Sequence, residues 1–354
     1  MSKILGVDIG SLTIKAATYS PMSAEVEELE VANHRRQPFQ RALNLIERVL
    51  EDQEISGLAF TGDSGESFAR VLNAYYVNPH LASAEANMRF FPHLRTILNI
   101  GAASSNLILI CEDNSGNPML DDIVLPPHCS AGTGSFLNQS ASRFGCSTEE
   151  FGRLALKSKN PENISGTCAV FAGSDMIDKQ QKGARKEDIA AGLHYALIKY
   201  LIGTLCRGKK LEGPYSFQGG VAENLGMVRA VEDILGSVEN PVKVFIPRYH
   251  RSMSAVGAAI QAGDRMAASK HLQHNARIRE YLQKARKKMS ELTTFKDVKL
   301  PPLELNDKIT IRRRAVDGIP SSEKKIPVYV GIDVGSVSTG GAVLYFADMA
   351  DDNG

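Results

Sequence analysis

A strand, a tight glycine turn and a second strand recur in this 354-residue chain, and this repeated pattern most constrains its fold. The first copy, at residues 4–18, contains GVDIGS. The second, at residues 96–111, contains NIGAAS, and a third begins at residue 328 with VYVGIDVGS. Each copy joins two apolar runs through small residues, which predicts a β-hairpin. Because a lone hairpin cannot bury its apolar face, the alternation of such strands with helical stretches favours a layered α/β fold.

Helical and strand patterns fill the space between these copies. Residues 38–52 carry apolar side chains at helical spacing, and STEE at residues 147–150 is a capping box that opens a helix to about residue 157. The remaining predicted helices cover residues 68–74, 187–206, 225–235, 254–268 and 271–292. Strands are predicted at residues 55–62, 215–218 and 242–247.

Composition narrows the class of protein. With 43% apolar and 23% charged residues, a chain of this length can build two or three ordinary globular units. The net charge of +1 favours neither nucleic acid nor an anionic membrane as a partner. No run approaches the roughly eighteen apolar residues of a spanning helix, and no signal-peptide pattern opens the chain. We therefore expect a cytoplasmic protein with no nucleic-acid or membrane partner.

The first hairpin turn has the chemistry of a phosphate site. Its backbone N–H groups could wrap phosphate together with the hydroxyls of Ser11 and Thr13. Asp8, at the end of a buried strand, could hold Mg²⁺ through water or orient an attacking water. The same residues also fit a plain hairpin in which Asp8 only serves the turn.

A cysteine precedes the third glycine-rich element. HCSAGTGS at residues 128–135 places Cys129 three residues before a turn that leads into a helix, whose N-terminus suits phosphate. Cys168 occupies a similar small-residue segment before a predicted helix. The five cysteines are an odd number without a C-x-x-C pair, so neither a disulfide framework nor a single-chain zinc or ferredoxin motif is expected. Buried packing is the alternative for each of them, and we expect it for Cys206.

Two further features have simpler explanations. His194 lies on a mostly apolar helix, which favours a satisfied core residue over a ligand. The basic residues of 271–292 indicate a solvated helix face rather than an RNA or lipid surface. By contrast, the pair Gly219 and Gly220 would let the backbone approach a flat ring or a ribose closely.

Together, GVDIGSLTIK, CSAGTGSFL, SGTCAVFA, GGVAEN and AVGAA resemble a known family across residues 3–265. They are similar to activators of 2-hydroxyacyl-CoA dehydratases and to ATPase subunits of benzoyl-CoA reductases, the BadF/BadG-type ATPases. These belong to the actin, sugar-kinase and heat-shock-chaperone superfamily. The resemblance implies an actin-like ATPase fold with two ribonuclease-H-like lobes around a cleft that binds ATP or ADP with Mg²⁺. It also implies a [4Fe–4S] cluster shared by two subunits, which passes electrons from a ferredoxin or flavodoxin to a dehydratase or reductase.

Carried over to this chain, the resemblance assigns roles to individual residues. Asp8 would be catalytic, and Cys129 and Cys168 would ligate the cluster together with a second subunit or repeat. The implied nucleotide-binding residues are Gly10, Ser11, Leu12, Thr13, Lys15, Gly101, Gly132, Thr133, Gly134, Gly219, Gly220 and Asn224.

The chain departs from the family at positions that matter for catalysis. The acidic residues usual in the second turn are replaced by Asn99 and Ser104, and the usual Glu after VFA is Gly173. We therefore expect weak nucleotide binding or slow hydrolysis in this repeat. The alternatives are a non-catalytic or structural repeat and, less favoured, a small-molecule kinase, for which no carboxylate base stands out.

The resemblance and the repeated start predict four segments. Residues 1–125 would form the N-terminal lobe, and 126–268 the C-terminal lobe with the cysteine and adenosine motifs, returning to the first lobe near its end. Residues 269–327 would be a basic helix and a connector. Residues 328–354 would be the truncated start of a second ATPase repeat, which could pair with the first as an internal pseudo-dimer.

Overall fold

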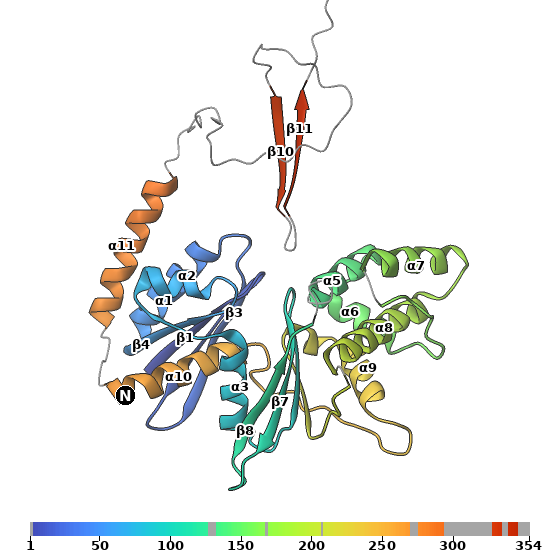
Figure 1. The fold of residues 1–354 in the computed structure, drawn as a ribbon, viewed down its shortest axis with the longest axis horizontal. Coiled ribbons are helices and arrows are strands. Elements are labelled where there is room, and N and C mark those ends of the chain that lie inside the picture. Colours follow the sequence, from blue (N-terminus) through green and yellow to red (C-terminus); the bar gives the residue numbers. More distant parts are fainter. Residues whose placement is uncertain are drawn as a thin grey trace, which may run out of the picture. The chain divides into compact units, whose positions relative to one another are not determined.

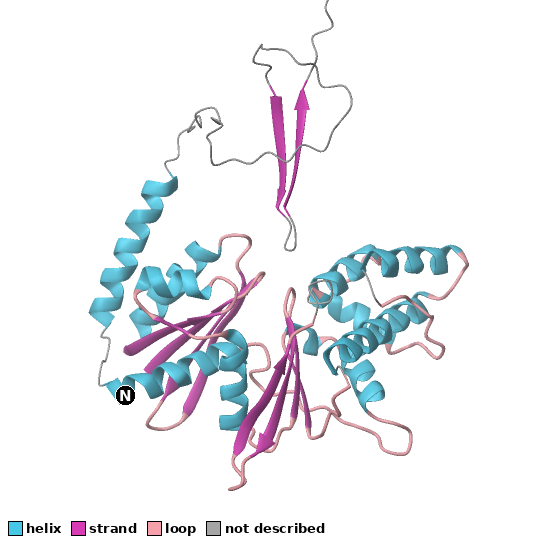
Figure 2. Cartoon of the chain, viewed as in Figure 1, coloured by secondary structure: helices cyan, strands magenta, loops and turns pink. Residues whose placement is uncertain are grey.

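The computed structural model describes residues 3–126, 132–166, 169–206, 208–269, 275–293, 328–334 and 339–345. Two compact units, Met1–Phe295 and Lys296–Gly354, make up the chain. The first unit contains two sheets with helices packed on them (Figures 1 and 2). Cys129, Cys168 and most of the predicted connector lie outside the described residues.

The first sheet has the strand order β3-β2-β1-β4-β5. Its strands are β1 Lys3–Ile9, β2 Thr13–Ser20, β3 Glu25–Asn33, β4 Ile55–Thr61 and β5 Tyr75–Tyr76. The predicted hairpin is confirmed, since β1 and β2 pair antiparallel with Asp8 opposite Lys15. Strand β4 then pairs with β1 in parallel, so the ends of β1 and β4 meet at one edge of the sheet.

The second sheet repeats this arrangement, with the order β8-β7-β6-β9. Its strands are β6 Thr96–Ile100, β7 Ser105–Glu112, β8 Pro118–Val124 and β9 Tyr215–Gln218. Strands β6 and β7 form the second predicted hairpin, and β9 pairs with β6 in parallel as β4 does with β1. Each sheet thus presents a glycine turn beside the end of a parallel strand.

Helices cover both faces of the first sheet. They are α1 Pro38–Asp52, α2 Gly65–Leu72, α3 Pro79–Phe90, α10 Met253–Ser269 and α11 Asn275–Thr293. One core joins the sheet to α1, α2 and α11, and another joins it to α3 and α10. The backbones of β1 and α10 approach each other closely. A Cβ on Gly6 of β1 would overlap the backbone of Ala255 in α10, so this approach requires glycine. We call each sheet with the helices packed on it a lobe. Strands β6–β8 then belong to the second lobe, not to an N-terminal lobe that ends at residue 125 as predicted, and the chain returns to the first lobe through α10.

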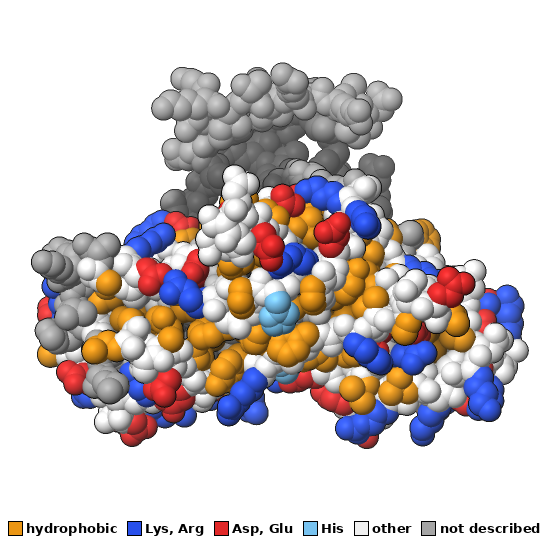
Figure 3. Space-filling view, turned by 90° about the horizontal axis from the view of Figure 1, so that it is seen from below, with side chains coloured by type: hydrophobic (Ala, Val, Ile, Leu, Met, Phe, Trp, Pro, Cys, Tyr) orange, Lys and Arg blue, Asp and Glu red, His pale blue; other side chains and the backbone are white. Residues whose placement is uncertain are grey.

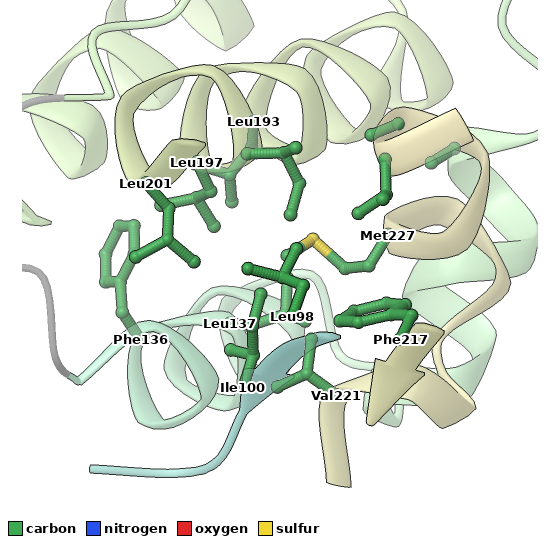
Figure 4. Packing of buried hydrophobic residues seen from close by; sticks show 14 of the residues in the cluster. Leu98, Ile100, Phe136, Leu137, Leu193, Leu197, Leu201, Phe217, Val221 and Met227 are labelled. Atoms are coloured by element: carbon green, nitrogen blue, oxygen red, sulfur yellow. The ribbon is translucent and has the colours of Figure 1, made fainter. Parts of the chain in front are cut away.

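The helices of the second lobe enclose one large core (Figure 4). They are α5 Thr133–Arg143, α6 Thr148–Ala155, α7 Ala169–Gln181, α8 Lys186–Cys206, the short η1 Gly220–Glu223 and α9 Leu225–Leu235. The α6 capping box forms as predicted. In Figure 4, Leu193, Leu197 and Leu201 of α8 face Leu98, Phe217 and Met227.

Helix α8 is apolar enough over a long enough stretch to correct the expectation that no segment approaches a membrane-spanning helix. Among the described residues it alone has the length and mean hydropathy, 1.4 over eighteen residues, of a membrane-spanning helix. More than half of that window is buried inside the protein. A core helix that is apolar on nearly all sides can have the same length and mean hydropathy. The packing of α8 inside the protein therefore explains its composition.

Helix α3 connects the two lobes. Ala82 and Ala86 pack with α10, whereas Ala84 packs with strands of the second sheet. Asn87 and Gln218 are fully buried, and their side-chain amides exchange hydrogen bonds of 3.2 and 2.6 Å. This reciprocal pair satisfies two buried amides that would be costly to leave without partners.

Three sequence predictions change on inspection of the structure. Residues 242–247 form no regular strand, because only an isolated bridge joins Phe245 to Ser216. The short helix predicted at 68–74 begins earlier, at Gly65. Helix α11 is not only a solvated face, since Ile278, Leu282 and Ala285 are buried against the first lobe.

Lys and Arg side chains intermix with acidic ones on the face in Figure 3, which agrees with the small net charge.

In the second unit, β10 Val328–Val334 and β11 Thr339–Tyr345 form an antiparallel hairpin. Its register matches that of β1 and β2, so Asp333 takes the place of Asp8. The residue opposite Asp333 is Gly340, whereas Lys15 lies opposite Asp8.

Candidate functional site

A cavity of about 310 Å³ lies where the turns of the two sheets meet within the first unit. Both hairpin turns, the β4–α2 turn, the starts of α3, α5 and α6, and the segment after β9 contribute to its wall. The lining residues include Asp8, Gly10, Leu12, Thr13, Lys15, Asp63, His80, Asn99, Gly101, Ser104, Asn106, Gly134, Glu149, Gly219, Gly220, Glu223 and Arg251. Most of the sequence-predicted site residues are therefore brought together here.

The first hairpin contributes an ion pair to this cavity. Lys15 Nζ donates to Asp8 Oδ2 at 2.9 Å, and both side chains are largely buried. The turn between them is closed by a hydrogen bond from Gly10 N–H to Thr13 O. His34, which the sequence did not single out, places its Nε2 within 3.0 Å of Ser11 O and 3.2 Å of Gly10 O. The buried imidazole thus contacts two carbonyl oxygens of the turn and helps to fix its conformation.

The second turn carries no carboxylate. It closes through Gly101 N–H and Ser104 O at 2.8 Å, and both residues line the cavity with Asn99. The positions that the resemblance expects to be acidic therefore face the cavity with neutral amide and hydroxyl groups. A cation there would gain less electrostatic stabilisation from this turn.

The start of α5 is hydrogen-bonded to the second turn. Gly134 N–H donates to Gly101 O at 3.2 Å, and Ser135 N–H donates to Ala102 O at 2.9 Å. A Cβ on Gly134 would overlap Gly101 O, so the close approach requires glycine. Gly134 lines the cavity, but Gly132 and Thr133 are not among its lining residues. Two N–H groups predicted to face phosphate are thus occupied by carbonyls.

The glycine pair after β9 also lines the cavity. Gly219 has a φ of +85° and lies so close to Ile100 that a Cβ would overlap its carbonyl. Asn224, by contrast, is buried away from the lining. Its Oδ1 accepts from Met227 N–H as the cap of α9, and its Nδ2 donates to Thr148 O at 2.7 Å. Its side chain therefore serves the packing of the second lobe.

His194 belongs to the same buried network. Its Nδ1 lies 2.6 Å from Ala190 O, and its Nε2 lies 3.0 Å from Asn224 Oδ1. Burial lowers the pKa of His194 to about 4, outweighing these two oxygen contacts, which favour the charged form. The prediction that His194 is a satisfied core residue is confirmed.

Asp63 is a cavity carboxylate that sequence reasoning missed. It follows Gly62 in the turn after β4, and it is exposed to the cavity. Surrounding protein raises the pKa of Asp63, with a further contribution from the nearby charge of Asp8, while Lys15 opposes the shift. An acidic residue in a glycine turn at the end of a buried strand was the available signal.

The described cysteines do not form a metal site. Cys111, Cys146 and Cys206 are partly buried free thiols, and burial raises the pKa of Cys146 and Cys206. No group of three or more His, Cys, Asp or Glu side chains fit to bind a metal occurs in the described part of the chain. At Gly173, a Cβ would come within 2.6 Å of Arg143 Nη1, so this guanidinium fills the space beside the glycine.

Comparison with known proteins gives a consistent result. The sequence model of the BadF/BadG/BcrA/BcrD ATPase family matches residues 5–262. An activator of lactoyl-CoA dehydratase from Anaerotignum propionicum is 30% identical over 264 residues, covering 73% of this chain and 96% of that protein. A 2-hydroxyisocaproyl-CoA dehydratase activator from Clostridioides difficile is 33% identical over 173 residues, or 49% of this chain. That match spans only 61% of the relative's length.

A solved structure extends the likeness to three dimensions. The activator of the 2-hydroxyisocaproyl-CoA dehydratase from Clostridium difficile with bound ADPNP superimposes with a TM-score of 0.63 at 27% identity. The superposition covers 76% of this chain and 97% of that chain.

Proposed function

The chain belongs to the BadF/BadG/BcrA/BcrD ATPase family, and from this premise we propose that it is an ATP-binding and ATP-hydrolysing activator domain. Its fold is the predicted α/β fold of the actin-like ATPases. In this proposal, nucleotide turnover drives low-potential electron transfer to a 2-hydroxyacyl-CoA dehydratase-like or benzoyl-CoA reductase-like partner. The single observation that carries it is the cavity that joins both glycine turns to the Asp8–Lys15 pair.

The cavity fits a nucleotide with Mg²⁺. Leu12, Thr13 and Lys15 would bind phosphates from the first turn. Gly10, Gly101 and Gly134 would let the phosphates approach closely, since they line the cavity without side chains while their N–H groups donate to carbonyl oxygens. Gly219 and Gly220 would accommodate the nucleoside. Asp8 would hold Mg²⁺ through water, and its Oδ2 lies 2.9 Å from Lys15 Nζ beside the phosphate turn. The proposed contacts of Ser11, Gly132, Thr133 and Asn224 have less support, because none of these residues is among the lining residues.

The proposed [4Fe–4S] cluster would be held by Cys129 and Cys168. A cubane takes four thiolates, so a second copy or the second repeat would complete it. The three described cysteines do not compete for this role, since they lie apart from one another and two have raised thiol pKa values. When bound, the cluster supplies one-electron chemistry, and this chain supplies the thiolates.

Backbone contacts support a coupling between the two sites. The second turn lines the nucleotide cavity and is hydrogen-bonded to the start of α5, which follows Cys129 closely in sequence. A change in that turn on nucleotide binding would therefore move the α5 end of the cysteine segment. A ferredoxin or flavodoxin would supply the electrons in the cytoplasm.

Iron and acid-labile sulfide content of the anaerobically reconstituted protein tests the cluster. We expect one cubane per two chains in the parent, lost in Cys129→Ala and in Cys168→Ala. Cys206→Ala is the matched control and should keep the full iron content. A parent protein that binds no iron would contradict the electron-transfer proposal.

A second candidate, a degenerate repeat with little hydrolysis, is favoured by Asn99 and Ser104 at the cavity wall. Steady-state ATP turnover separates the two functions. A brisk Mg²⁺-dependent rate that Asp8→Ala abolishes would rule out the degenerate repeat. The less favoured kinase function needs a carboxylate base, and Asp63 is a group of that kind in the cavity.

A further inference from the structure

We propose that Asp63 orients the water that attacks the terminal phosphate of ATP and takes a proton from it. This inference rests on the proposed nucleotide function of the cavity, and it assigns the acidic role in the cleft to a turn that carried no role in the sequence analysis.

The β4–α2 turn is fixed against the end of β1. Gly62 has a φ of +88°, and a Cβ there would overlap Asp8 Oδ1. On the other side of Asp63, Ser64 N–H donates to Ile9 O at 3.3 Å. Both neighbours of Asp63 are thus packed on the strand that carries Asp8. The backbone of Ser11, in the phosphate turn, acts on this carboxylate in the direction that lowers its pKa, against the larger effect of burial.

Two of the four carboxylates at the cavity are paired with cations. Asp8 is paired with Lys15, and Glu223 is paired with Arg251 at 3.2 Å. The backbone and Ser147 at the start of α6 lower the pKa of Glu149, which makes that carboxylate a weaker proton acceptor. Asp63 forms no ion pair within the described residues, and burial and the charge of Asp8 raise its pKa, which suits a proton acceptor.

The second turn leaves this role open. Asn99, Ser104 and Asn106 present amides and a hydroxyl to the cavity, and none of these is a base. His80, at the start of α3, is a cavity residue whose pKa is lowered by burial, and its Nδ1 lies 2.9 Å from Asn106 Nδ2. Among the described lining residues, Asp63 is therefore the carboxylate available beside the phosphate turn.

The step balances without another reactant. The oxygen of water forms a bond to the γ-phosphorus as the bond between the γ-phosphorus and the β–γ bridging oxygen breaks, which gives ADP and inorganic phosphate. One proton of the water passes to a carboxylate oxygen of Asp63 and is then released to solvent. Lys15 would offset the charge of the leaving ADP, and Asp8 would hold a Mg²⁺ that supplies further positive charge when it is bound.

Single-turnover ATP hydrolysis and the affinity for a fluorescent ATP analogue, both with Mg²⁺, test this role. Asp63→Asn keeps the shape of the side chain but removes the base. We expect it to lower the hydrolysis rate about 100-fold and to change the affinity by less than about threefold. Asp63→Ala should lower the hydrolysis rate and preserve the affinity to the same extent as Asp63→Asn. Glu66→Gln, in the first turn of α2 and outside the cavity, is the matched control and should keep the parent rate.

The outcomes distinguish this inference from the proposed function. An Asp63→Asn rate within about threefold of the parent overturns the role of Asp63 and leaves the ATPase intact. An affinity loss as large as the rate loss also overturns it, because Asp63 would then serve binding. A parent that binds the analogue but hydrolyses no ATP overturns both the role of Asp63 and the proposed turnover. A parent that binds no nucleotide overturns the proposed function as a whole.

Discussion

Two helical glycines differ in what a single added carbon atom would meet. At Gly257 of α10, a Cβ would overlap the backbone of Ala82 in α3, whereas at Gly203 of α8 no atom lies within 4 Å. We expect Gly257→Ala to lower the free energy of unfolding by about 2 kcal/mol or more, because packed backbone cannot yield easily. Gly203→Ala should raise it by about 0.5–1 kcal/mol through helix propensity. Urea denaturation measures both, and equal effects would contradict the close α3–α10 contact.

His194 makes stability depend on pH. Its pKa is about 4 in the folded protein, against an ordinary value near 6.5. Below pH 6.5 the His194 imidazole binds a proton in the unfolded chain but stays mostly neutral in the folded protein until the pH approaches 4. The free energy of unfolding therefore falls as the pH falls. The contribution is fully present above about pH 6.5, and roughly 3 kcal/mol of it is lost by pH 4.

Denaturation at pH 7.5 and pH 5.0 tests this expectation. The parent should lose about 2 kcal/mol more than His194→Gln over this interval, because glutamine does not titrate. His93→Gln, at an exposed position, should behave as the parent does. An identical pH dependence in the parent and His194→Gln would show that His194 is charged in the folded state.

At the scale of elements, α11 is anchored to the first lobe by specific contacts. Asn275 Oδ1 accepts from Ile55 N–H at 2.8 Å, and Asn275 Nδ2 donates to Gln53 O beyond the end of α1. Arg286 Nε donates to Glu47 Oε1 at 2.7 Å and lowers the pKa of that carboxyl. This helix lies outside residues 5–262, which match the family, so it is an addition to the family core.

Truncating a buried side chain of α11 measures how much this helix contributes. Leu282 is almost fully buried, and Leu282→Ala should lower the free energy of unfolding by about 3 kcal/mol. Lys284→Ala removes an exposed pair with Glu280 and an exposed cation–π contact with Tyr281, and should change it by less than about 1 kcal/mol. If Leu282→Ala were as mild as Lys284→Ala, α11 would not be part of the cooperative unit.

At the scale of the whole first unit, nucleotide binding should stabilise both lobes together. A ligand at about 100 times its Kd adds roughly 2.7 kcal/mol to the free energy of unfolding. We expect Mg-ATP to raise the Tm of the parent, and Asp8→Ala to weaken that shift because the carboxylate proposed to hold Mg²⁺ is gone. ATP with a chelator should have a smaller effect. A parent Tm that Mg-ATP does not change would contradict nucleotide binding in the cavity.

Several elements were predictable because their signals are local. The α1 bounds at Pro38 and Asp52 and the α6 capping box follow from periodicity and side-chain caps. Strands β3 and β8 were not identified, since they lie at sheet edges and lack a buried apolar run. The bridge at Phe245 replaced a predicted strand because pairing depends on the neighbouring β9.

The sequence alone determined the hairpins, the order of the glycine motifs and the family, because these depend on residues close together in the chain. Only the tertiary structure decided which side chains share a cavity. Asp63 lies beside Asp8 because β4 pairs in parallel with β1, and Gly134 reaches Gly101 because α5 begins against the second turn. Asn224 is held away from the cavity in part by such a distant contact, because its Nδ2 donates to Thr148 O at the start of α6. Contacts between distant residues depend on strand pairing and helix packing, which local patterns do not specify.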